Sequence, residues 1–260
     1  MRTLRQGLLV QGRVINALML REIHTINGKS RLGYLWVLIQ TMFNIAVFWG
    51  IRMIAGAQAP HGMSMLLFLA SGFCVWNIFS NSVNKCMSAV DANRALLTFP
   101  QVKESDVMLA RVLVLAATEV LTLLILTIMG WLLAIPFEPD SLLLLIFVLL
   151  ITPLLGLGLG MIFSSLAVFV PVLEKLVPMA LRVLFFASGV FFSVTAFSHE
   201  LASWLLFNPV MQLIEMLRMS LHTGYLTQGM SYEYVIFLTI VALVLGGFLE
   251  RYTRDKRDNG

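Results

Sequence analysis

The stretch that decides the fold runs from Leu142 to Val170, LLLLIFVLLITPLLGLGLGMIFSSLAVFV, and contains no charged side chain. An α-helix rises about 1.5 Å per residue, so about 20 apolar residues cross the roughly 30 Å hydrocarbon core of a bilayer. This stretch is therefore predicted to be a membrane-spanning helix. It is long enough to tilt, and Pro153 is a point at which it can kink.

The composition of the whole chain indicates the same class of protein. Of its 260 residues, 59% are hydrophobic and 12% are charged, whereas a soluble domain has roughly 25% charged residues. A soluble fold needs polar side chains to cover its surface. The composition therefore excludes an ordinary cytosolic enzyme, a nucleic-acid-binding protein and a disordered regulator. The net charge of +4 is expected to reflect membrane topology, with no nucleic acid as a partner.

Two further features concern the processing of the chain. Cys74 and Cys86 are too few for a disulfide framework, and we expect both to be free thiols. The N-terminal segment has only a short early apolar run, Leu8 to Val10, whereas a cleavable signal peptide needs about 7–15 apolar residues. The spans themselves are therefore expected to direct insertion.

Six stretches have the length and apolar character of membrane spans. They cover residues 34–55, 63–84, 112–135, 142–170, 176–196 and 234–249. The predicted fold class is an all-α integral membrane protein with six transmembrane helices.

The basic residues predict the orientation, because cytoplasmic segments carry an excess of lysine and arginine. Sixteen of the 18 fall on one predicted side: Arg2, Arg5, Arg13, Arg21, Lys29, Arg31, Lys85, Arg94, Lys103, Arg111, Lys175, Arg182, Arg251, Arg254, Lys256 and Arg257. Arg218 falls on the other side, as does Arg52, which can snorkel to the outer interface. Both termini are therefore predicted to be cytoplasmic. The chain divides into an N-terminal segment over 1–31, a transmembrane domain over 32–250 and a tail over 251–260.

Two segments on the predicted cytoplasmic side are amphipathic. Residues 4–24 mix apolar side chains with arginine and glutamine, and the apolar ones recur at near-helical spacing, which predicts a basic helix lying in the membrane interface. This helix is either a surface anchor or a docking surface for a cytoplasmic subunit. The loop over 85–111 is predicted to contain a short helix that Asp91 caps and Pro100 ends. The loop either receives force from a soluble motor or is a solvated connector. The helix holds the candidate coupling residues Asp91, Asn93, Arg94, Leu96 and Leu97.

The predicted outer loop before the last span is long and unusually apolar. Two short helices are expected over 201–207 and 210–221, separated by Asn208 and Pro209. Asn208 fits the N-cap of the second helix and Pro209 its first turn. Glu215 and Arg218 are three residues apart on that helix, a spacing at which side chains can pair. We expect the region over 199–222, with Trp204, to form re-entrant or interfacial gate helices at an outer mouth.

Glu119 and several aromatic residues lie inside predicted spans. A charge near mid-bilayer is costly, so Glu119 should face protein or water; it either forms an interhelical hydrogen bond or lines a substrate path. Phe43, Phe73, Trp76 and Phe79 fall away from the span ends, where they either pack or line a passage on which sugar rings can stack. Gly156, Gly158 and Gly160 lie in GLGLG, and such small residues typically allow close helix packing.

Catalytic and metal-binding motifs do not appear in the sequence. Gly28-Lys29-Ser30 resembles the end of a phosphate-binding loop, but the first glycine of that motif is replaced by Ile23. The four histidines are scattered, and no metal-binding or nucleophilic pattern is present. Any energy for work is therefore expected to come from another subunit.

Two stretches resemble a known family. Leu20-Arg21-Glu22-Ile23-His24, followed by residues 28–36 with the sequence GKSRLGYLW, is similar to the start of the first span in type-2 ABC exporter permeases. The likeness is greatest to the inner-membrane subunit of bacterial capsular polysaccharide exporters. The Asn208-Pro209 and Glu215-x-x-Arg218 region also resembles that family's outer loop. One departure is Thr41, where many members have proline.

The resemblance implies a homodimeric permease in the bacterial inner membrane, with two copies of a separate ATP-binding subunit. No cofactor is expected in this chain, because ATP and magnesium would bind to that subunit. The resemblance also implies an interface helix held by Arg21 and Glu22, a coupling helix and two gate helices. Lipid-linked capsular polysaccharide would be the cargo, and membrane lipids and periplasmic and outer-membrane export proteins would be further partners.

Two alternatives remain at this stage. The first keeps an ABC permease and changes the cargo to O-antigen, teichoic acid, a lipid or a drug. The second is a membrane-embedded glycan or lipid transferase, whose site needs clustered acidic or metal-binding residues. Glu200, Glu215 and Glu233 are dispersed along the sequence, which argues against such an enzyme.

Overall fold

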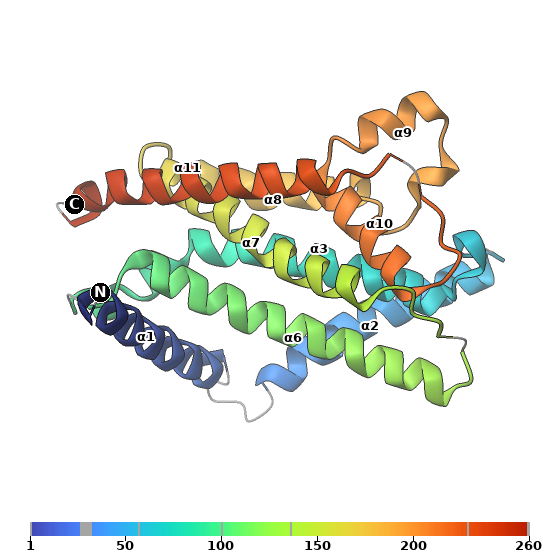
Figure 1. Cartoon of the computed structure of the whole chain (residues 1–260), viewed down its shortest axis with the longest axis horizontal. Helices are drawn as coiled ribbons and strands as arrows, with labels where there is room; N and C mark the ends of the chain where they lie inside the picture. Colours follow the sequence, from blue (N-terminus) through green and yellow to red (C-terminus); the bar gives the residue numbers. More distant parts are fainter. Residues whose placement is uncertain are drawn as a thin grey trace.

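A computed structural model describes residues 2–26, 33–56, 58–99, 101–135, 137–227 and 229–258 (Figure 1). Over these residues the chain is helical, with a single isolated bridge between Glu138 and His222 as its only β pairing. The elements are α1 (Arg2–Ile26), α2 (Gly33–Ile54), η1 (Pro60–Gly62), α3 (Met65–Met87), α4 (Ala89–Ala92), α5 (Arg94–Leu97), α6 (Glu104–Leu132), α7 (Leu142–Ala167), α8 (Leu173–Ala187), η2 (Val194–Ala196), α9 (His199–Leu205), α10 (Pro209–Leu221) and α11 (Tyr232–Asp258).

Four helices of the described chain are long and apolar enough to cross a membrane: α3, α6, α7 and α11. The apolar part of α2, Leu38–Ile54, is shorter than these four, and α8 has 15 residues. The prediction of an all-α membrane protein is confirmed. The helix predicted over 4–24 also forms, as α1. Lys29 and Arg31, two of the basic residues used to predict the orientation, lie outside the described residues.

The fifth predicted span, over 176–196, is helical only as far as Ala187. Gly189 has a φ of +78°, a left-handed conformation that glycine adopts readily, and the backbone leaves the helix there. A Cβ atom at this position would lie 2.1 Å from the Met211 sulfur atom. The chain then continues without helix until the short η2 turn.

Two other boundaries differ from the prediction. α6 begins at Glu104, eight residues before the predicted start of the span at 112. At this start, the Asp106 carboxylate accepts a hydrogen bond of 3.3 Å from the Lys103 backbone N–H. α11 continues through the predicted start of the tail at 251, with Arg254 bonded to Glu250 one turn earlier (2.6 Å). Charged residues thus extend these helices beyond their apolar sections.

α3 is the centre of the bundle, because 89% of its most apolar 18-residue stretch is buried. It packs against α6, α7 and α10, while α7 packs against α11 on another side. Glycines of α7 permit these contacts: a Cβ at Gly160 would lie 2.6 Å from the Cys86 Cβ, and one at Gly158 would lie 2.7 Å from α11 backbone. The predicted role of this glycine run in helix packing is confirmed. Pro153 lies inside the continuous α7 helix.

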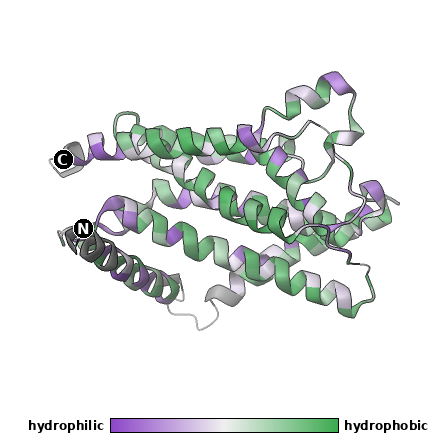
Figure 2. Ribbon diagram, viewed as in Figure 1, coloured by the Kyte–Doolittle hydropathy of each residue, from purple (hydrophilic) through white to green (hydrophobic). Residues whose placement is uncertain are grey.

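The two termini lie at the same end of the bundle, which we call the terminal end (Figure 1). α9 and α10 lie toward the other end, the distal end. Hydrophobic residues dominate the long helices between these ends, and hydrophilic residues gather toward both of them (Figure 2). Cys74 and Cys86 are buried and form no disulfide, as expected.

Candidate functional site: a distal polar cluster and a terminal-end coupling surface

The two short helices predicted before the last span are present at the distal end as α9 and α10. The Asn208 side chain caps α10 by accepting a hydrogen bond of 3.0 Å from the Val210 backbone N–H, and Pro209 occupies the first turn, both as predicted. Asn208 also donates to the Ser188 hydroxyl (2.9 Å), which ties the start of α10 to the end of α8. The two helices differ in burial: α10 is almost wholly buried, whereas Trp204 of α9 is 70% exposed.

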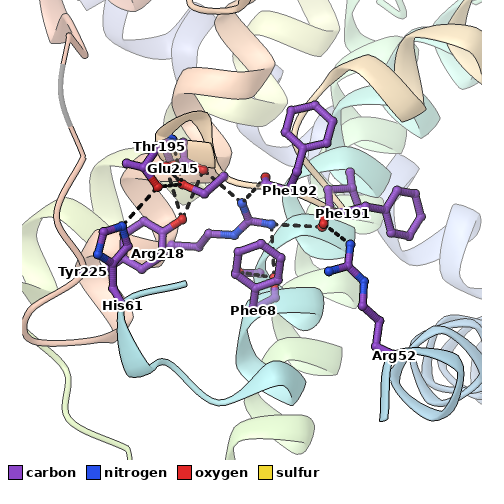
Figure 3. Close-up of polar contacts among 12 residues, drawn as sticks. Arg52, His61, Phe68, Phe191, Phe192, Thr195, Glu215, Arg218 and Tyr225 are labelled. Carbon is purple, nitrogen blue, oxygen red and sulfur yellow. Dashed lines mark hydrogen bonds and ion pairs between the residues drawn. The ribbon is translucent and has the colours of Figure 1, made fainter. Parts of the chain in front are cut away.

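Glu215 and Arg218 form a fully buried ion pair, which confirms the pairing predicted from their spacing (Figure 3). Arg218 Nη1 lies 3.0 Å from Glu215 Oε1. Glu215 also accepts hydrogen bonds from the Ser193 hydroxyl (3.0 Å) and the Tyr225 hydroxyl (3.2 Å). A buried charge is tolerated only when it is paired and hydrogen-bonded, and this carboxylate has three donors.

Arg218 also binds the backbone of two other segments. Its Nη1 donates to the Phe192 carbonyl (3.0 Å), and its Nη2 donates to the carbonyls of Val190 (3.0 Å) and Phe68 (3.3 Å). Its guanidinium lies 3.6 Å from the centre of the Phe68 ring, where a cation is attracted to the π face. Arg218 thus links α10, α3 and the segment after α8.

Arg52, at the end of α2, donates a hydrogen bond to the Phe191 carbonyl (Figure 3). The snorkelling of Arg52 to the outer interface stays a prediction, and the structure adds a protein partner for its guanidinium. The two arginines together occupy the three consecutive carbonyls of Val190, Phe191 and Phe192, which we call the clasped segment. Non-helical backbone in a membrane protein needs such partners, because hydrocarbon offers no hydrogen bonds.

A histidine and a tyrosine join η1 to this cluster. The His61 ring lies edge-on to the Tyr225 ring, 5.0 Å away, and its Nε2 is 3.2 Å from the Thr195 hydroxyl oxygen. His61 adopts a φ of +58°, which is uncommon for a residue with a side chain. Burial raises the pKa of Tyr225 to about 12, so its hydroxyl keeps its proton and can donate to Glu215 at neutral pH.

The predicted coupling residues lie near the terminal end, in two single-turn helices. The expectation that Asp91 caps a helix is wrong: Asp91 lies inside α4, and its carboxylate pairs with Arg94 of α5 (3.1 Å) at an exposed surface. Asn93, between the two turns, is buried and donates to the Ala89 carbonyl (2.8 Å). α5 ends at Leu97, and Pro100 lies outside the described residues. The half-buried Leu96 and Leu97 pack on a small core beneath this loop.

α1 is attached to this loop and to α6 by side chains along its length. Arg21 donates to the Asn93 side-chain oxygen (2.8 Å), and Glu22 pairs with Arg111 of α6 (3.3 Å). Gln11 donates to Asp106 (2.8 Å). The two residues predicted to hold the interface helix, Arg21 and Glu22, therefore both contact the coupling region. α1, α4, α5 and the start of α6 form one packed surface, which we call the coupling surface.

The predicted path residues occupy different environments. Phe43 of α2 is 66% exposed, whereas Phe73, Trp76 and Phe79 of α3 are buried. Phe185 lies 5.5 Å from Trp76 and joins these rings into an aromatic cluster that also contains Phe48 and Phe191. A path-lining role stays a prediction, and for the buried rings it would require the helices around them to separate.

Glu119 of α6 is buried among three helices. The Asn77 side chain of α3 donates to its carboxylate (3.4 Å), and the Thr41 side chain of α2 is a second hydrogen-bond partner. This arrangement is the interhelical hydrogen bond considered from the sequence. Thr41, the departure from the family pattern, thus has a polar partner that proline would lack.

Sequence reasoning missed several members of the distal cluster. They are Arg52 as a backbone donor, the ring of Phe68, His61, Ser193, Thr195 and Tyr225. Arg52 carried the only signal, as the one basic residue at the predicted outer end of the first two spans. Its partner is 139 residues away in the chain, and no local pattern connects them.

Comparison with known proteins identifies the group to which this architecture corresponds. The sequence pattern of ABC-2 type transporters matches residues 13–222, which include the second half of α1, the α4–α5 loop and the Glu215–Arg218 pair. The chain belongs to the ABC-2 type transporter family. Within this family, it is 31% identical over 252 residues to the polysialic acid transport protein KpsM of Escherichia coli, covering 97% of both chains.

Other relatives in the ABC-2 family have related descriptions. The chain is 29% identical to the capsule polysaccharide export inner-membrane protein BexB of Haemophilus influenzae, over 95% of this chain and 93% of BexB. It is 22% identical to the O-antigen export system permease protein RfbA of Klebsiella pneumoniae, over 84% of this chain and 82% of RfbA. The similarity to the capsule proteins is thus both higher and more extensive.

Proposed function

We propose that this chain is the permease subunit of an ATP-driven exporter that moves a lipid-linked capsular polysaccharide across the bacterial inner membrane. The observation that carries this proposal is the 31% identity to a polysialic acid transport protein over 97% of both chains. Relatives described as capsule polysaccharide export proteins also match over at least nine-tenths of their length. The transport role further agrees with a chain made of apolar helices.

The proposed topology has both termini in the cytoplasm. Figure 1 supports it because the N- and C-termini lie at one end of the bundle, which an even number of crossings requires. Arg94 and Arg251 are exposed, and α11, which carries Arg251 near its end, runs to the terminal end (Figure 1), in agreement with the excess of basic residues in cytoplasmic segments.

Six crossings follow if α2 and α8 are added to the four long apolar helices. α8 has 15 residues, equivalent to about 22 Å at 1.5 Å per residue, which is less than the hydrocarbon thickness. The clasped segment after α8 extends the chain toward the distal end, and its carbonyls have arginine partners. In this proposal, α8 and the clasped segment together make the fifth crossing.

The energy is proposed to come from two copies of a separate ATP-binding subunit, which would bind ATP and magnesium. The coupling surface suits this role because α1 is hydrogen-bonded to Asn93, between α4 and α5, and is also joined to α6 by two side-chain contacts. A push on α4 and α5 would therefore also reach α1 and α6. Arg94 and Asp91 are 79% and 61% exposed, so they are accessible to such a partner.

At the distal end, α9 and α10 are proposed to form the outer gate of a passage between two copies of the chain. α10 is anchored by the buried Glu215–Arg218 pair, whereas α9 exposes Trp204 and the turn after α9 exposes Phe207. A fixed helix next to an exposed one is a suitable arrangement for a movable cover. The periplasmic export proteins expected as partners would contact this end.

Complementation tests the function directly. A capsule-deficient strain that lacks its capsule permease is supplied with this chain and the ATP-binding subunit from the same source, and surface polysaccharide is measured. Restored capsule supports the proposal. Restored O-antigen in a parallel strain, without capsule, would assign the other cargo instead.

A further inference from the structure

α8 carries two cations on the side of the helix that faces away from the bundle. Lys175, Met179, Arg182 and Phe186 are spaced by four, three and four residues, which places them on one stripe of the helix. Met179 and Phe186 are 64% and 63% exposed, and both cations are exposed as well. We call these four residues the α8 stripe.

The opposite side of α8 provides its packing. Val177 and Leu181 are buried there, and the helix packs against α3 and α7. The orientation of α8 is therefore set by apolar contacts, and the α8 stripe is left without contacts to these two helices. The sequence predicts Arg182 on the cytoplasmic side, and in the structure it lies inside α8, nine residues after the helix begins at Leu173.

The position of Arg182 is costly if the stripe faces only lipid. Arg182 follows Lys175 by seven residues, or about 10 Å along the axis, in a helix whose other residues there are apolar. Charged side chains in membrane helices face protein, water or a partner, because hydrocarbon does not solvate them. Among the four ion pairs of the described chain, neither Lys175 nor Arg182 takes part.

The α8 stripe carries positive charge without a compensating acid on the same stripe. Glu174 is adjacent in sequence to Lys175, but consecutive helical residues project about 100° apart. The two cations therefore present donors to whatever lies against this side of α8. Charge complementarity favours an anionic occupant.

Aromatic rings follow the cations toward the distal end. The Phe186 ring stacks on Phe191 of the clasped segment, with 5.9 Å between centroids and an angle of 25°. Phe185, the residue before Phe186, lies against Trp76. Going from the terminal end to the distal end, the side of the bundle around α8 presents an ammonium group, a guanidinium group and then ring faces. This order suits a molecule with both an anionic group and sugar rings.

We propose that the α8 stripe binds an anionic oxygen group of the exported glycolipid, either the phosphate of its lipid anchor or the carboxylates of its sugars. Lys175 meets this group near the terminal end, and Arg182 holds it deeper in the membrane with its paired N–H donors. The inference rests on the proposed function, because that function supplies a cargo that carries such groups.

Binding to the purified full-length chain in discs of neutral lipid tests this assignment. Two probes separate the sources of the anion: a radiolabelled polysialic acid oligomer has carboxylates and no lipid, and phosphatidylglycerol has a phosphate and no glycan. The variants are Arg182→Ala, the conservative Arg182→Lys and the matched control Arg251→Ala, which removes an exposed cation from α11.

We expect Arg182→Ala to weaken the binding of at least one probe about tenfold, as the loss of a charge-assisted hydrogen bond would. Arg182→Lys should stay within about threefold of the unchanged chain, and Arg251→Ala should have no effect. The probe that responds identifies the source of the anion. The inference is overturned if Arg182→Ala binds both probes as tightly as the unchanged chain does. It is also overturned if Arg251→Ala weakens binding as much as Arg182→Ala does. Dissociation of the purified oligomer by Arg182→Ala overturns it as well, because the residue would then be a subunit contact.

Capsule export by the same variants separates this inference from the proposed function. Export by the unchanged chain together with unaltered binding by Arg182→Ala leaves the proposed function standing and rejects the α8 stripe. Arg182-dependent binding by a chain that exports no polysaccharide rejects the proposed function and keeps the stripe as an anion site.

Discussion

Arg52 and Arg218 donate hydrogen bonds to consecutive carbonyls of the same backbone segment: Arg52 binds that of Phe191, and Arg218 binds those of Val190 and Phe192. The two arginines come from α2 and α10, which are far apart in the sequence. Two elements at the distal end are thus joined through the clasped segment. A movement of α2 away from α10 would break the bond of Arg52, whereas Arg218 would stay anchored by Glu215.

Replacing Arg52 is expected to loosen the clasped segment without unfolding the protein. Arg52→Ala removes one donor from the Phe191 carbonyl, whereas Arg52→Lys keeps a cation and a donor. Val194, which follows the segment, is 2% exposed, so a cysteine placed there should react slowly with a membrane-impermeant maleimide. We expect Arg52→Ala to speed this labelling several-fold and Arg52→Lys to change it less.

The control for this measurement is the chain with its native cysteines alone. Cys74 and Cys86 are both buried and should contribute little background. An unchanged labelling rate at residue 194 in Arg52→Ala would show that Arg218 alone holds the segment.

Removing Arg218 is expected to destabilise the fold strongly. Arg218→Met leaves the Glu215 carboxylate buried without its counter-charge and removes the donors for three carbonyls. Breaking one partner of a buried pair typically costs about 3–5 kcal/mol. Thermal unfolding in detergent, followed by tryptophan fluorescence, should show a clearly lower transition temperature.

The double variant Arg218→Met with Glu215→Gln is the matched control, because it leaves no uncompensated charge. We expect its loss of stability to be smaller than the sum of the two single losses. Additive losses would mean that the two side chains act independently in spite of the 3.0 Å contact.

The parts of this structure that could be predicted depend on neighbours in the sequence. Asn208 and Pro209 begin α10 because a cap and a first-turn proline act within one turn, and Glu215 meets Arg218 because they are three residues apart on that helix. The end of α8 could not be predicted in this way. Residues 188–196 are as apolar as a span, and the backbone turns at Gly189 because Arg52 and Arg218 supply hydrogen-bond donors from distant positions.

The α4–α5 region shows the same limit for a polar segment. Asp91 has the side chain of a helix cap, and a local pattern therefore predicted that role. In the structure, Asn93 is buried and bonds to Arg21, 72 residues away, so the loop folds into two single turns around that contact. Asp91 then lies within the first turn and pairs with Arg94.

The glycines of α7 should be intolerant of a methyl group. An alanine at Gly158 would place its Cβ 2.7 Å from backbone atoms of α11, which cannot move aside as a side chain can. Overpacking of this kind costs about 1–3 kcal/mol, and we expect Gly158→Ala to lower the thermal transition in detergent. Gly50→Ala in α2 is the control, because nothing lies within 4 Å of the added atom. Equal transitions for the two variants would contradict the close approach of α7 and α11.

Glu119 should tolerate an amide but not an apolar residue. Glu119→Gln keeps an acceptor for the Asn77 side chain, whereas Glu119→Leu leaves the polar groups of Asn77 and Thr41 without this partner. An unsatisfied buried polar group costs about 1–3 kcal/mol. We expect the glutamine variant to export polysaccharide at nearly the normal rate and the leucine variant to be less stable. Loss of export in a stably folded Glu119→Gln would instead assign the carboxylate to the substrate path.

Arg94 gives a test of energy coupling that is separate from stability. Its ion pair with Asp91 is exposed, and exposed pairs contribute about 0–1 kcal/mol, so Arg94→Glu should leave the thermal transition nearly unchanged. If the coupling surface binds the ATP-binding subunit, the reversed charge should reduce co-purification of that subunit by several-fold and reduce capsule export with it. Arg251→Glu, at an exposed position on α11, makes the same charge change outside the coupling surface and should do neither. Normal complex yield and export in Arg94→Glu would mean that the motor contacts another part of the terminal end, and α1 would be the next surface to test, because it is hydrogen-bonded to the same loop.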